Sequence, residues 1–269
     1  MGFRDIVVHL DNLDSTGARL ELAVCYARKH GANLRGLYLA APAFSKPRTT
    51  PEQFSYERVE AMFREKTAAA GITSEWILPR RSVNGLGITD IMLSYAYYTD
   101  LIIVGQHNFK SRSLHLPREL PEQLVMYCGR PVLIVPYIGQ FETAGDRIMI
   151  AWKAGRESVR SVNDAMPCIE KAHHVSVVEV SAEVIPAESS DHIIYVREFI
   201  ARHRATARTE QIYAGDFTVA DTILNLACEK TIDLLVMGTY AHTRRGTLAL
   251  SPVASHILKH LTVPVLMSH

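Results

Sequence analysis

The amino-acid sequence predicts an α/β protein that consists of two consecutive domains, each built on a parallel β-sheet. Two observations lead to this prediction. An internal repeat divides the chain, and within each copy short apolar strands alternate with amphipathic helices. The repeat is clearest in "TDLIIVGQ" at 99–106 and "IDLLVMGT" at 232–239, which both have an aspartate, a buried-strand pattern and a glycine. Strands that alternate with helices indicate parallel pairing through helical crossovers.

The repeat keeps a constant spacing over the second half of each copy. Three residues of the first copy recur 133 positions later, namely Asp100 as Asp233, Gly105 as Gly238 and Pro131 as Pro264. Near the start of the copies, "FRDIVVHLD" aligns with "GDRIMIAWK" at an offset of 142, so the first copy has about nine more residues in its middle. We therefore expect domains at 1–137 and 146–269, joined by a linker at 138–145.

The elements of the first copy follow from apolar periodicity and from breakers. Its strands are expected at 5–10, 32–40, 74–79, 101–104 and 132–135, and its helices at 16–30, 52–71, 89–98 and 119–127. Gly31 suits the C-terminal cap of the first helix. A stretch with three prolines in eleven residues, 41–51, is expected to be a loop.

The second copy repeats this order. Strands are expected at 148–152, 175–180, 207–215, 234–237 and 265–268, with helices around 159–169 and at 192–203, 218–229 and 253–260. In the first of these helices, Val159, Val162, Met166 and Ile169 have helical spacing and predict its buried face. The continuous apolar runs of the strands are typical of parallel sheets that are covered on both faces.

We expect neither a nucleic-acid nor a membrane partner. The 29 basic and 28 acidic residues argue neither for nor against a polyanionic partner, and no apolar run approaches the ~18 residues of a membrane span. The first residues enter a strand directly, so no secretory signal is expected. The four cysteines lack CxxC spacing and are expected to be small apolar core residues, which fits a cytoplasmic location.

Ligands of open parallel sheets bind beyond the carboxyl ends of the strands, where the strand order reverses. In these two copies that crevice is framed by the ends of the first and fourth strands. The residues there are Asp11 and Gly105 in the first copy, and Lys153 and Gly238 in the second. A glycine at this position lets the backbone approach a phosphate, whose charge the next helix N-terminus can hold.

The chain resembles the universal stress protein family, in its tandem two-domain form. The resemblance rests on "DIVVHLD", "TDLIIVG" and "RPVLIVP" in the first copy and on "IDLLVMGTYAHTRRG" and "VPVLMSH" in the second. It implies Rossmann-like domains of the adenine nucleotide alpha hydrolase-like kind, each a five-stranded parallel sheet in order 3-2-1-4-5 flanked by helices. In that family an aspartate after the first strand contacts adenine. Phosphates and ribose are held by a loop of the form G-x-x-G, nine residues, then G and Ser or Thr.

Both copies depart from the nucleotide motif of the family. The second copy keeps Gly238, followed by Thr239, but has Ala241, Ser251 and Pro252 at the remaining motif positions. The first copy keeps Asp11 and Gly105, but has Asn108, Arg118 and Glu119 in the loop. The candidate nucleotide-binding residues are therefore Asp11, Gly105, Gly238, Thr239, Ala241 and Ser251, for ATP or AMP bound weakly. The second copy is the expected site because its replacements are small.

Each of these residues also has a structural interpretation. Asp11 could be a turn residue after the first strand, and Gly238 an inherited tight turn without a ligand. Arg244 and Arg245 could reach a phosphate or form a solvated surface. His256 and His260 are the best placed histidines for a metal, but they lack ligand spacing with other residues, so no metal is expected.

The function that this sequence favours is a non-catalytic cytoplasmic stress-response protein that binds an adenine nucleotide or an unknown protein partner. No nucleophile with an activating base is recognisable, so we do not expect an enzyme. Two alternatives stay open, an enzyme that hydrolyses ATP or transfers a nucleotide, and a structural interaction module with vestigial pockets. The edge strands 132–135 and 265–268 are expected to pair, either as a pseudo-dimer within the chain or in a homodimer.

Overall fold

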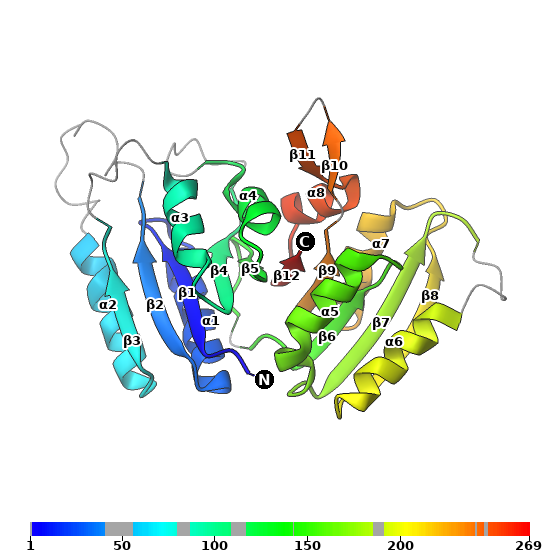
Figure 1. The fold of residues 1–269 in the computed structure, drawn as a ribbon, viewed down its shortest axis with the longest axis horizontal. Helices are drawn as coiled ribbons and strands as arrows, with labels where there is room; N and C mark the ends of the chain where they lie inside the picture. The colour runs from blue at the N-terminus through cyan, green and yellow to red at the C-terminus, as the bar shows by residue number, and fades with distance from the viewer. Residues whose placement is uncertain are drawn as a thin grey trace. The chain divides into compact units, whose positions relative to one another are not determined.

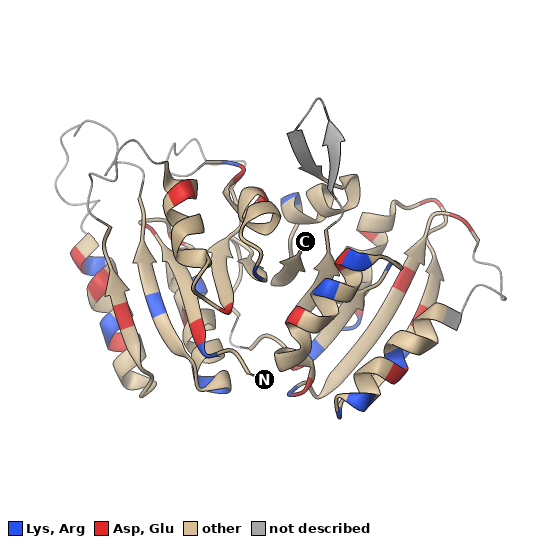
Figure 2. Cartoon of the chain, in the orientation of Figure 1, with Lys and Arg blue, Asp and Glu red and all other residues tan. Residues whose placement is uncertain are grey.

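The computed structural model describes residues 2–40, 56–79, 87–108, 117–141, 143–184, 191–239, 241–244 and 247–269. The chain divides into two compact units, Met1–Glu142 and Thr143–His269, and this division falls inside the segment 138–145. In each unit a parallel sheet carries helices on both faces (Figure 1). Basic and acidic side chains are interspersed over the elements of both units (Figure 2).

Unit 1 contains five parallel strands in the order β3-β2-β1-β4-β5. Its elements are β1 (Asp5–Leu10), α1 (Thr16–His30), β2 (Asn33–Tyr38), α2 (Tyr56–Ala69), β3 (Ser74–Ile77), α3 (Ile88–Ala96), β4 (Leu101–Gly105), α4 (Leu120–Tyr127) and β5 (Val132–Val135). Helix α1 ends at Gly31, whose φ of 64° lies in the left-handed region that a helix cap of this kind requires. The expected proline-rich loop at 41–51 lies outside the described residues.

Unit 2 contains five parallel strands in the equivalent order, β8-β7-β6-β9-β12. Its elements are β6 (Arg147–Ala151), α5 (Arg156–Ile169), β7 (His174–Ser181), α6 (Asp191–Arg202), β8 (Ala207–Tyr213), α7 (Val219–Glu229), β9 (Leu234–Gly238), β10 (Ala241–Arg244), β11 (Thr247–Leu250), α8 (Pro252–Lys259) and β12 (Val265–Ser268). Within each unit the order is 3-2-1-4-5, and the expected α/β fold is confirmed. The expected pairing of the edge strands stays a prediction.

A β-hairpin in unit 2 was not expected from the sequence. Strands β10 and β11 pair antiparallel, with Ala241 opposite Leu250 and Arg244 opposite Thr247. This segment corresponds to the phosphate loop of the resembling family, so the resemblance implies a loop here. Strands of four residues are too short to show a convincing two-residue periodicity in the sequence.

Two expectations about the core were wrong. Val159 is 50% exposed, whereas α5 buries the side that carries Ser158, Ser161 and Val162. The small serines let this helix lie close to the sheet, which turns the adjacent valine outward. Of the cysteines, Cys128 and Cys168 are buried as expected, but Cys25 is half-buried and Cys228 is exposed.

The aspartate that opens each repeated segment joins the start of the first strand to the start of the fourth. In unit 1 the Asp100 carboxylate accepts hydrogen bonds from the N–H groups of Arg4 and Asp5, at 2.7 and 3.0 Å. In unit 2 the Asp233 carboxylate accepts from the N–H groups of residues 145–147, at 2.8–3.1 Å. Because both carboxylates bind backbone that precedes or begins a central strand, this part of the repeat is structural.

We predict that Asp233→Ala lowers the free energy of unfolding by about 2 kcal/mol, because a charge-assisted hydrogen bond contributes about 1.5–3 kcal/mol and this carboxylate is partly solvated. Asp100→Ala should cost less, since that carboxylate accepts from two N–H groups rather than three. Urea unfolding followed by circular dichroism measures both. An Asp233→Ala variant as stable as the wild type would contradict the structural interpretation.

Candidate functional site

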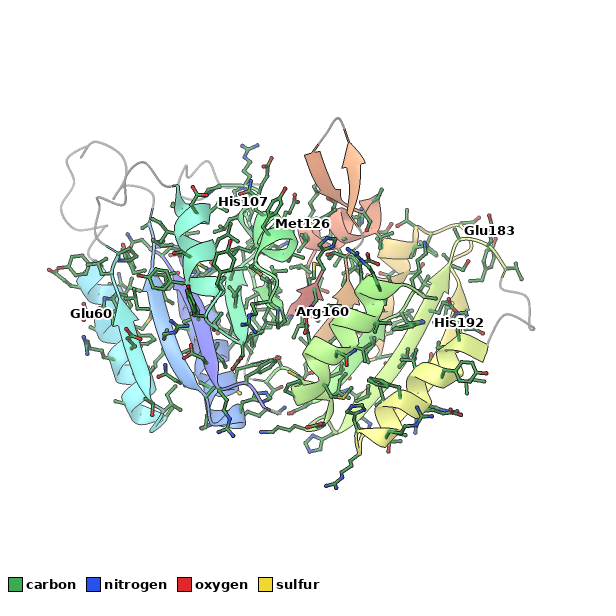
Figure 3. All side chains as sticks on the ribbon, in the orientation of Figure 1. Glu60, His107, Met126, Arg160, Glu183 and His192 are labelled. Atoms are coloured by element: carbon green, nitrogen blue, oxygen red, sulfur yellow. The ribbon has the colours of Figure 1, made fainter. Side chains whose placement is uncertain are left out.

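Unit 1 contains a cavity of about 310 Å³ beyond the carboxyl ends of β1 and β4. This is the position at which open parallel sheets bind ligands. Its lining residues come from the segment before α1, from α1, from the end of β4 and its following loop, from α4 and from the segment after β5. They are Leu13, Asp14, Ser15, Arg19, Gly105, Gln106, His107, Asn108, Pro117, Leu120, Pro121, Tyr137 and Ile138. His107 lies on the segment that follows β4, on this side of the sheet (Figure 3).

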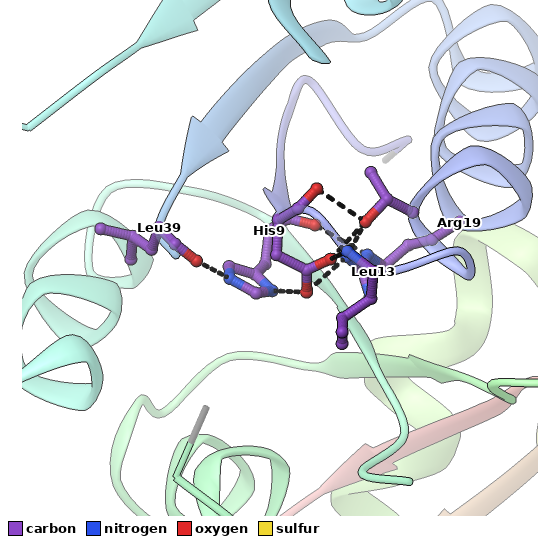
Figure 4. Close-up of polar contacts among 6 residues, drawn as sticks. His9, Leu13, Arg19 and Leu39 are labelled. Carbon is purple, nitrogen blue, oxygen red and sulfur yellow. Dashed lines mark hydrogen bonds and ion pairs between the residues drawn. The ribbon is translucent and has the colours of Figure 1, made fainter. Parts of the chain in front are cut away.

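Asp11 directly follows β1 and is buried. Its Oδ1 atom accepts hydrogen bonds from the N–H of Leu13, at 2.9 Å, and from the hydroxyl of Thr16. Its Oδ2 atom lies 3.0 Å from Nη2 of Arg19, a buried ion pair. Both carboxylate oxygens are therefore engaged within the chain (Figure 4).

Arg19 completes this network from the second turn of α1. Its Nε donates to the carbonyl oxygen of His9 at 2.7 Å, and its Nη2 donates to Thr16 Oγ1 at 3.0 Å. The remaining nitrogen, Nη1, lies over Gly105, where a Cβ atom would be 2.1 Å from it. Gly105 is thus required because the guanidinium occupies the space that a side chain would take.

Burial and charge shift the pKa values of this network in different ways. Burial acts to raise the pKa of Asp11, but Arg19, His9 and two hydrogen bonds outweigh it, so that the pKa of this carboxyl is lowered. The pKa of His9 is lowered to about 4, chiefly by burial. His9 is therefore neutral at pH 7 and donates through Nε2 to the carbonyl oxygen of Leu39, at 2.9 Å (Figure 4).

The structure brings two candidates together, Asp11 and Gly105, but gives them a different role from the one expected. Asp11 was a candidate acceptor for adenine, and its oxygens instead hold Arg19, Thr16 and Leu13. Arg19 was not among the residues expected at the site. A signal was available, because Arg19 lies three and four residues before the buried Leu22 and Ala23, on the apolar face of its helix.

In unit 2 the equivalent position is filled by the chain itself. A Cβ atom on Gly238 would lie 2.3 Å from the carbonyl carbon of Glu157 and 2.5 Å from the nitrogen of Ser158. Helix α5 therefore begins directly against the end of β9, and the glycine permits this close packing. The expectation that Gly238 opens a phosphate cradle is not supported on this face. Lys153, the counterpart of Asp11, is exposed.

The other candidates of unit 2 are also engaged in local structure. Thr239 is buried, and its N–H and hydroxyl both donate to the carbonyl oxygen of Ser268, at 2.9 and 3.3 Å. Ser251 is the N-cap of α8 and accepts from the N–H of Ala254 at 3.2 Å. Ala241 and Arg244 begin and end β10, and Arg245 lies outside the described residues.

The histidines considered for a metal form a pair of stacked rings. His256 and His260 have ring centroids 4.4 Å apart and an interplanar angle of 9°. Nε2 of His256 lies 2.8 Å from Asp221, whose pKa is lowered first by its hydrogen bond with Thr218 and then by His256. Parallel rings do not direct their nitrogens to one point. Among the described residues no group of three His, Cys, Asp or Glu side chains is arranged to hold a metal ion.

We predict that Gly238→Ala destabilises the protein by at least about 3 kcal/mol, at the upper end of ordinary overpacking, because the added methyl meets backbone atoms that cannot rotate away. Gly17→Ala is the matched control. A Cβ at position 17 meets nothing within 4 Å, so this variant should be neutral or more stable by up to about 1 kcal/mol. Thermal and urea unfolding of both variants would test the prediction. Equal stability of the two would exclude close packing as the reason for Gly238.

A second prediction concerns pH. The pKa of His9 in the folded chain is about 4, below its ordinary value of 6.5. Between pH 6.5 and pH 4, His9 is therefore protonated in the unfolded chain but not in the folded chain. The contribution of His9 to the free energy of unfolding is complete above pH 6.5. As the pH drops toward 4, this contribution falls by about 2–3 kcal/mol. His9→Gln keeps a donor for Leu39 without titrating. Urea unfolding at pH 7 and 4.5 should show a smaller loss for this variant, and identical losses would contradict the prediction.

Comparison with known proteins gives one family match and several similar structures. Residues 169–269 match the model of the universal stress protein family. No curated protein matches the chain. A universal stress protein from Archaeoglobus fulgidus has a TM-score of 0.70 at 14% identity, over 98% of this chain and 97% of its own.

Two further structures cover both units. A putative universal stress protein from Pseudomonas aeruginosa has a TM-score of 0.61 at 17% identity, over 99% of this chain and 93% of its own. The cytoplasmic domain of a prokaryotic cation chloride cotransporter has a TM-score of 0.51 at 10% identity, over 98% of this chain and 94% of its own. No helix in the described part of this chain is long and apolar enough to cross a membrane. Residues 169–269, which form most of unit 2, thus match the universal stress protein family, and the chain as a whole has the fold of universal stress proteins.

Proposed function

We propose that this protein is a non-catalytic, cytoplasmic stress-response protein in which unit 1 binds a small ligand and unit 2 serves as a structural or partner-binding module. The observation that carries this proposal is the difference between the two crevices. In unit 1 a cavity of about 310 Å³ lies beside Gly105 and Arg19. In unit 2 the backbone of α5 packs on the equivalent Gly238. The unknown protein partner would bind to unit 2.

The same geometry supports weak binding of ATP or AMP at most. For Asp11 to accept from adenine, it would have to release the buried Arg19, and breaking a buried ion pair costs about 3–5 kcal/mol. The loop after β4 has Asn108, Arg118 and Glu119 at the positions of the family glycines and the Ser or Thr. The loss of a single charge-assisted hydrogen bond to phosphate, about 1.5–3 kcal/mol, weakens affinity roughly 10- to 150-fold.

The proposed ligand site lies in unit 1, whereas the sequence favoured the second copy. Small residues after Gly238 made the second copy the expected nucleotide site. The packing of Glu157 and Ser158 against that glycine supports unit 1 instead, because the space beside it is occupied. The cavity of unit 1 is at the lower end of the range for small-molecule sites, roughly 300–1,000 Å³.

An enzymatic role has less support from the arrangement at the cavity. Phosphoryl transfer requires a positioned nucleophile and cations that clamp the transferring group. The Thr16 hydroxyl is buried and donates to Asp11, so it is held inside the network. Two edges of the Arg19 guanidinium are bound to His9, Thr16 and Asp11. We therefore propose that ligand binding, and not turnover, is the function of this unit.

We predict that isothermal titration of the full chain with ATP or AMP gives a dissociation constant no tighter than about 100 μM, about −5.5 kcal/mol. Asp11→Asn should lower the free energy of unfolding, because it leaves Arg19 buried without its counter-charge, but it should not abolish what nucleotide binding there is. The conservative variant Thr16→Ser, which keeps the hydroxyl, is the matched control.

The opposite result would be submicromolar ATP binding that is lost in a folded Asp11→Asn variant, which would show that this aspartate recognises the base. ATP hydrolysis at about 1 per second, in the range of ordinary phosphotransferases, would contradict the non-catalytic proposal. Loss of such turnover in Arg244→Ala would locate it in unit 2.

A further inference from the structure

We propose that the cavity of unit 1 is a receptor for a small organic monocarboxylate, whose carboxylate is held by the Nη1 edge of the buried Arg19 and whose apolar body lies against the cavity wall. This inference rests on the proposed function of unit 1 as the ligand-binding unit and specifies the chemical class of its ligand.

The hydrogen bonds of Arg19 provide the first argument. A guanidinium has five N–H donors, one on Nε and two on each Nη nitrogen. Nε and Nη2 bind His9, Thr16 and Asp11. Nη1 donates to no residue in the described ranges, although Arg19 is only 1% exposed. A ligand oxygen at Nη1 would therefore meet donors that no residue in the described ranges occupies.

The position of Nη1 directs these donors to the cavity. Nη1 lies over Gly105, and both Arg19 and Gly105 line the cavity. The guanidinium is fixed on its other two edges, so its orientation is set before a ligand arrives. A charged N–H donor in a fixed position matches a carboxylate oxygen, which accepts a charge-assisted hydrogen bond from it.

The charges around the cavity disfavour a ligand with several negative charges. The N-terminus of the 15-residue helix α1 contributes partial positive charge beside Ser15, and its first turn carries no acidic side chain. The charge of Arg19 is already balanced by Asp11, and the exposed Asp14 also lines the cavity. Burial, and then Arg118, lower the pKa of His107, which is therefore neutral at pH 7. A triphosphate would meet too little positive charge here.

The rest of the lining is suited to an apolar body. Leu13, Leu120, Pro121 and Ile138 contribute hydrocarbon surface to the wall. A cavity of about 310 Å³ accommodates a molecule with a single ring or a short branched chain. Benzoate combines such a body with one carboxylate and is therefore the probe of choice. Benzamide has the same shape without the charge.

The experiment titrates the full chain with benzoate, benzamide, inorganic phosphate and ATP, with binding followed by calorimetry and by ligand-observed NMR. We expect saturable benzoate binding, with benzamide at least about tenfold weaker, which corresponds to one charge-assisted hydrogen bond. Phosphate and ATP should bind more weakly than benzoate. Arg19→Lys keeps a positive charge beside Asp11 but cannot bind His9 and Thr16 while it also places a donor over Gly105, and it should lose at least about tenfold in benzoate affinity.

Two exposed positions provide variants that do not disturb the buried pair. Ile138 is 72% exposed and lines the cavity, so Ile138→Asp should weaken benzoate binding and Ile138→Lys should strengthen it, each about two- to fivefold at low salt. Asp14→Asn should strengthen it by a similar factor. Ile138→Thr is the matched neutral control, because all three Ile138 variants lose the same apolar side chain. Benzamide should therefore bind equally to Ile138→Asp, Ile138→Lys and Ile138→Thr, and it should not respond to Asp14→Asn. These variants decide the question even if Arg19→Lys fails to fold.

Each outcome has a distinct meaning. Benzamide or ATP binding as tight as benzoate binding, or benzoate affinity that Arg19→Lys and the Ile138 variants leave unchanged, would overturn the carboxylate inference while the ligand-binding role of unit 1 stands. Phosphate that binds as tightly as benzoate would overturn the role of the apolar wall. Failure of all four probes to bind would contradict both this inference and the proposed function, and would indicate that Nη1 is satisfied by water.

Discussion

The buried ion pair between Asp11 and Arg19 is the interaction on which the organisation of unit 1 depends. It joins the end of β1 to the second turn of α1, and through Arg19 Nη1 it reaches Gly105 at the end of β4. The pair is buried, so each charge is tolerated only because the other is present. Gly105 and the orientation of the guanidinium both follow from it, whereas His9 is kept neutral chiefly by its own burial. The cavity is built beside a charge that the fold has already oriented.

The two units show that one repeated glycine can meet two different physical requirements. Gly105 makes room for a side chain, the guanidinium of Arg19. Gly238 makes room for backbone, the first turn of α5. The difference lies in where the first helix of each unit is placed, because the contacts of α1 are with β1, β2 and β4, whereas those of α5 are mainly with β9 and β12. Two copies of one motif thus place a side chain against the glycine in unit 1 and helix backbone against the equivalent glycine in unit 2.

The fold of this chain is compatible with many functions, and the side chains around the cavity of unit 1 narrow them further. The same arrangement of elements occurs in universal stress proteins and in the cytoplasmic domain of a transporter. Folds of this kind carry many activities, and function depends on particular side chains. Here the distinguishing features are the engagement of Asp11 within the chain and the availability of Nη1 on Arg19. Both favour recognition of a small ligand over the base and phosphates of a nucleotide.

The sequence by itself determined the α/β class, the two repeats, the strands and helices of each unit and the crevice at which to look, because periodicity, glycines and repeat spacing are local properties of the chain. It also located Asp11, Gly105 and Gly238 at strand ends. It could not determine what each of them contacts. Whether Asp11 accepts from a ligand or from Arg19 depends on the rotation of α1, and whether Gly238 faces a ligand or Ser158 depends on the approach of α5. The hairpin of β10 and β11 was missed for the same reason, since strands of four residues are defined by their partner. Tertiary packing decided these points because burial and close approach involve residues distant in the chain.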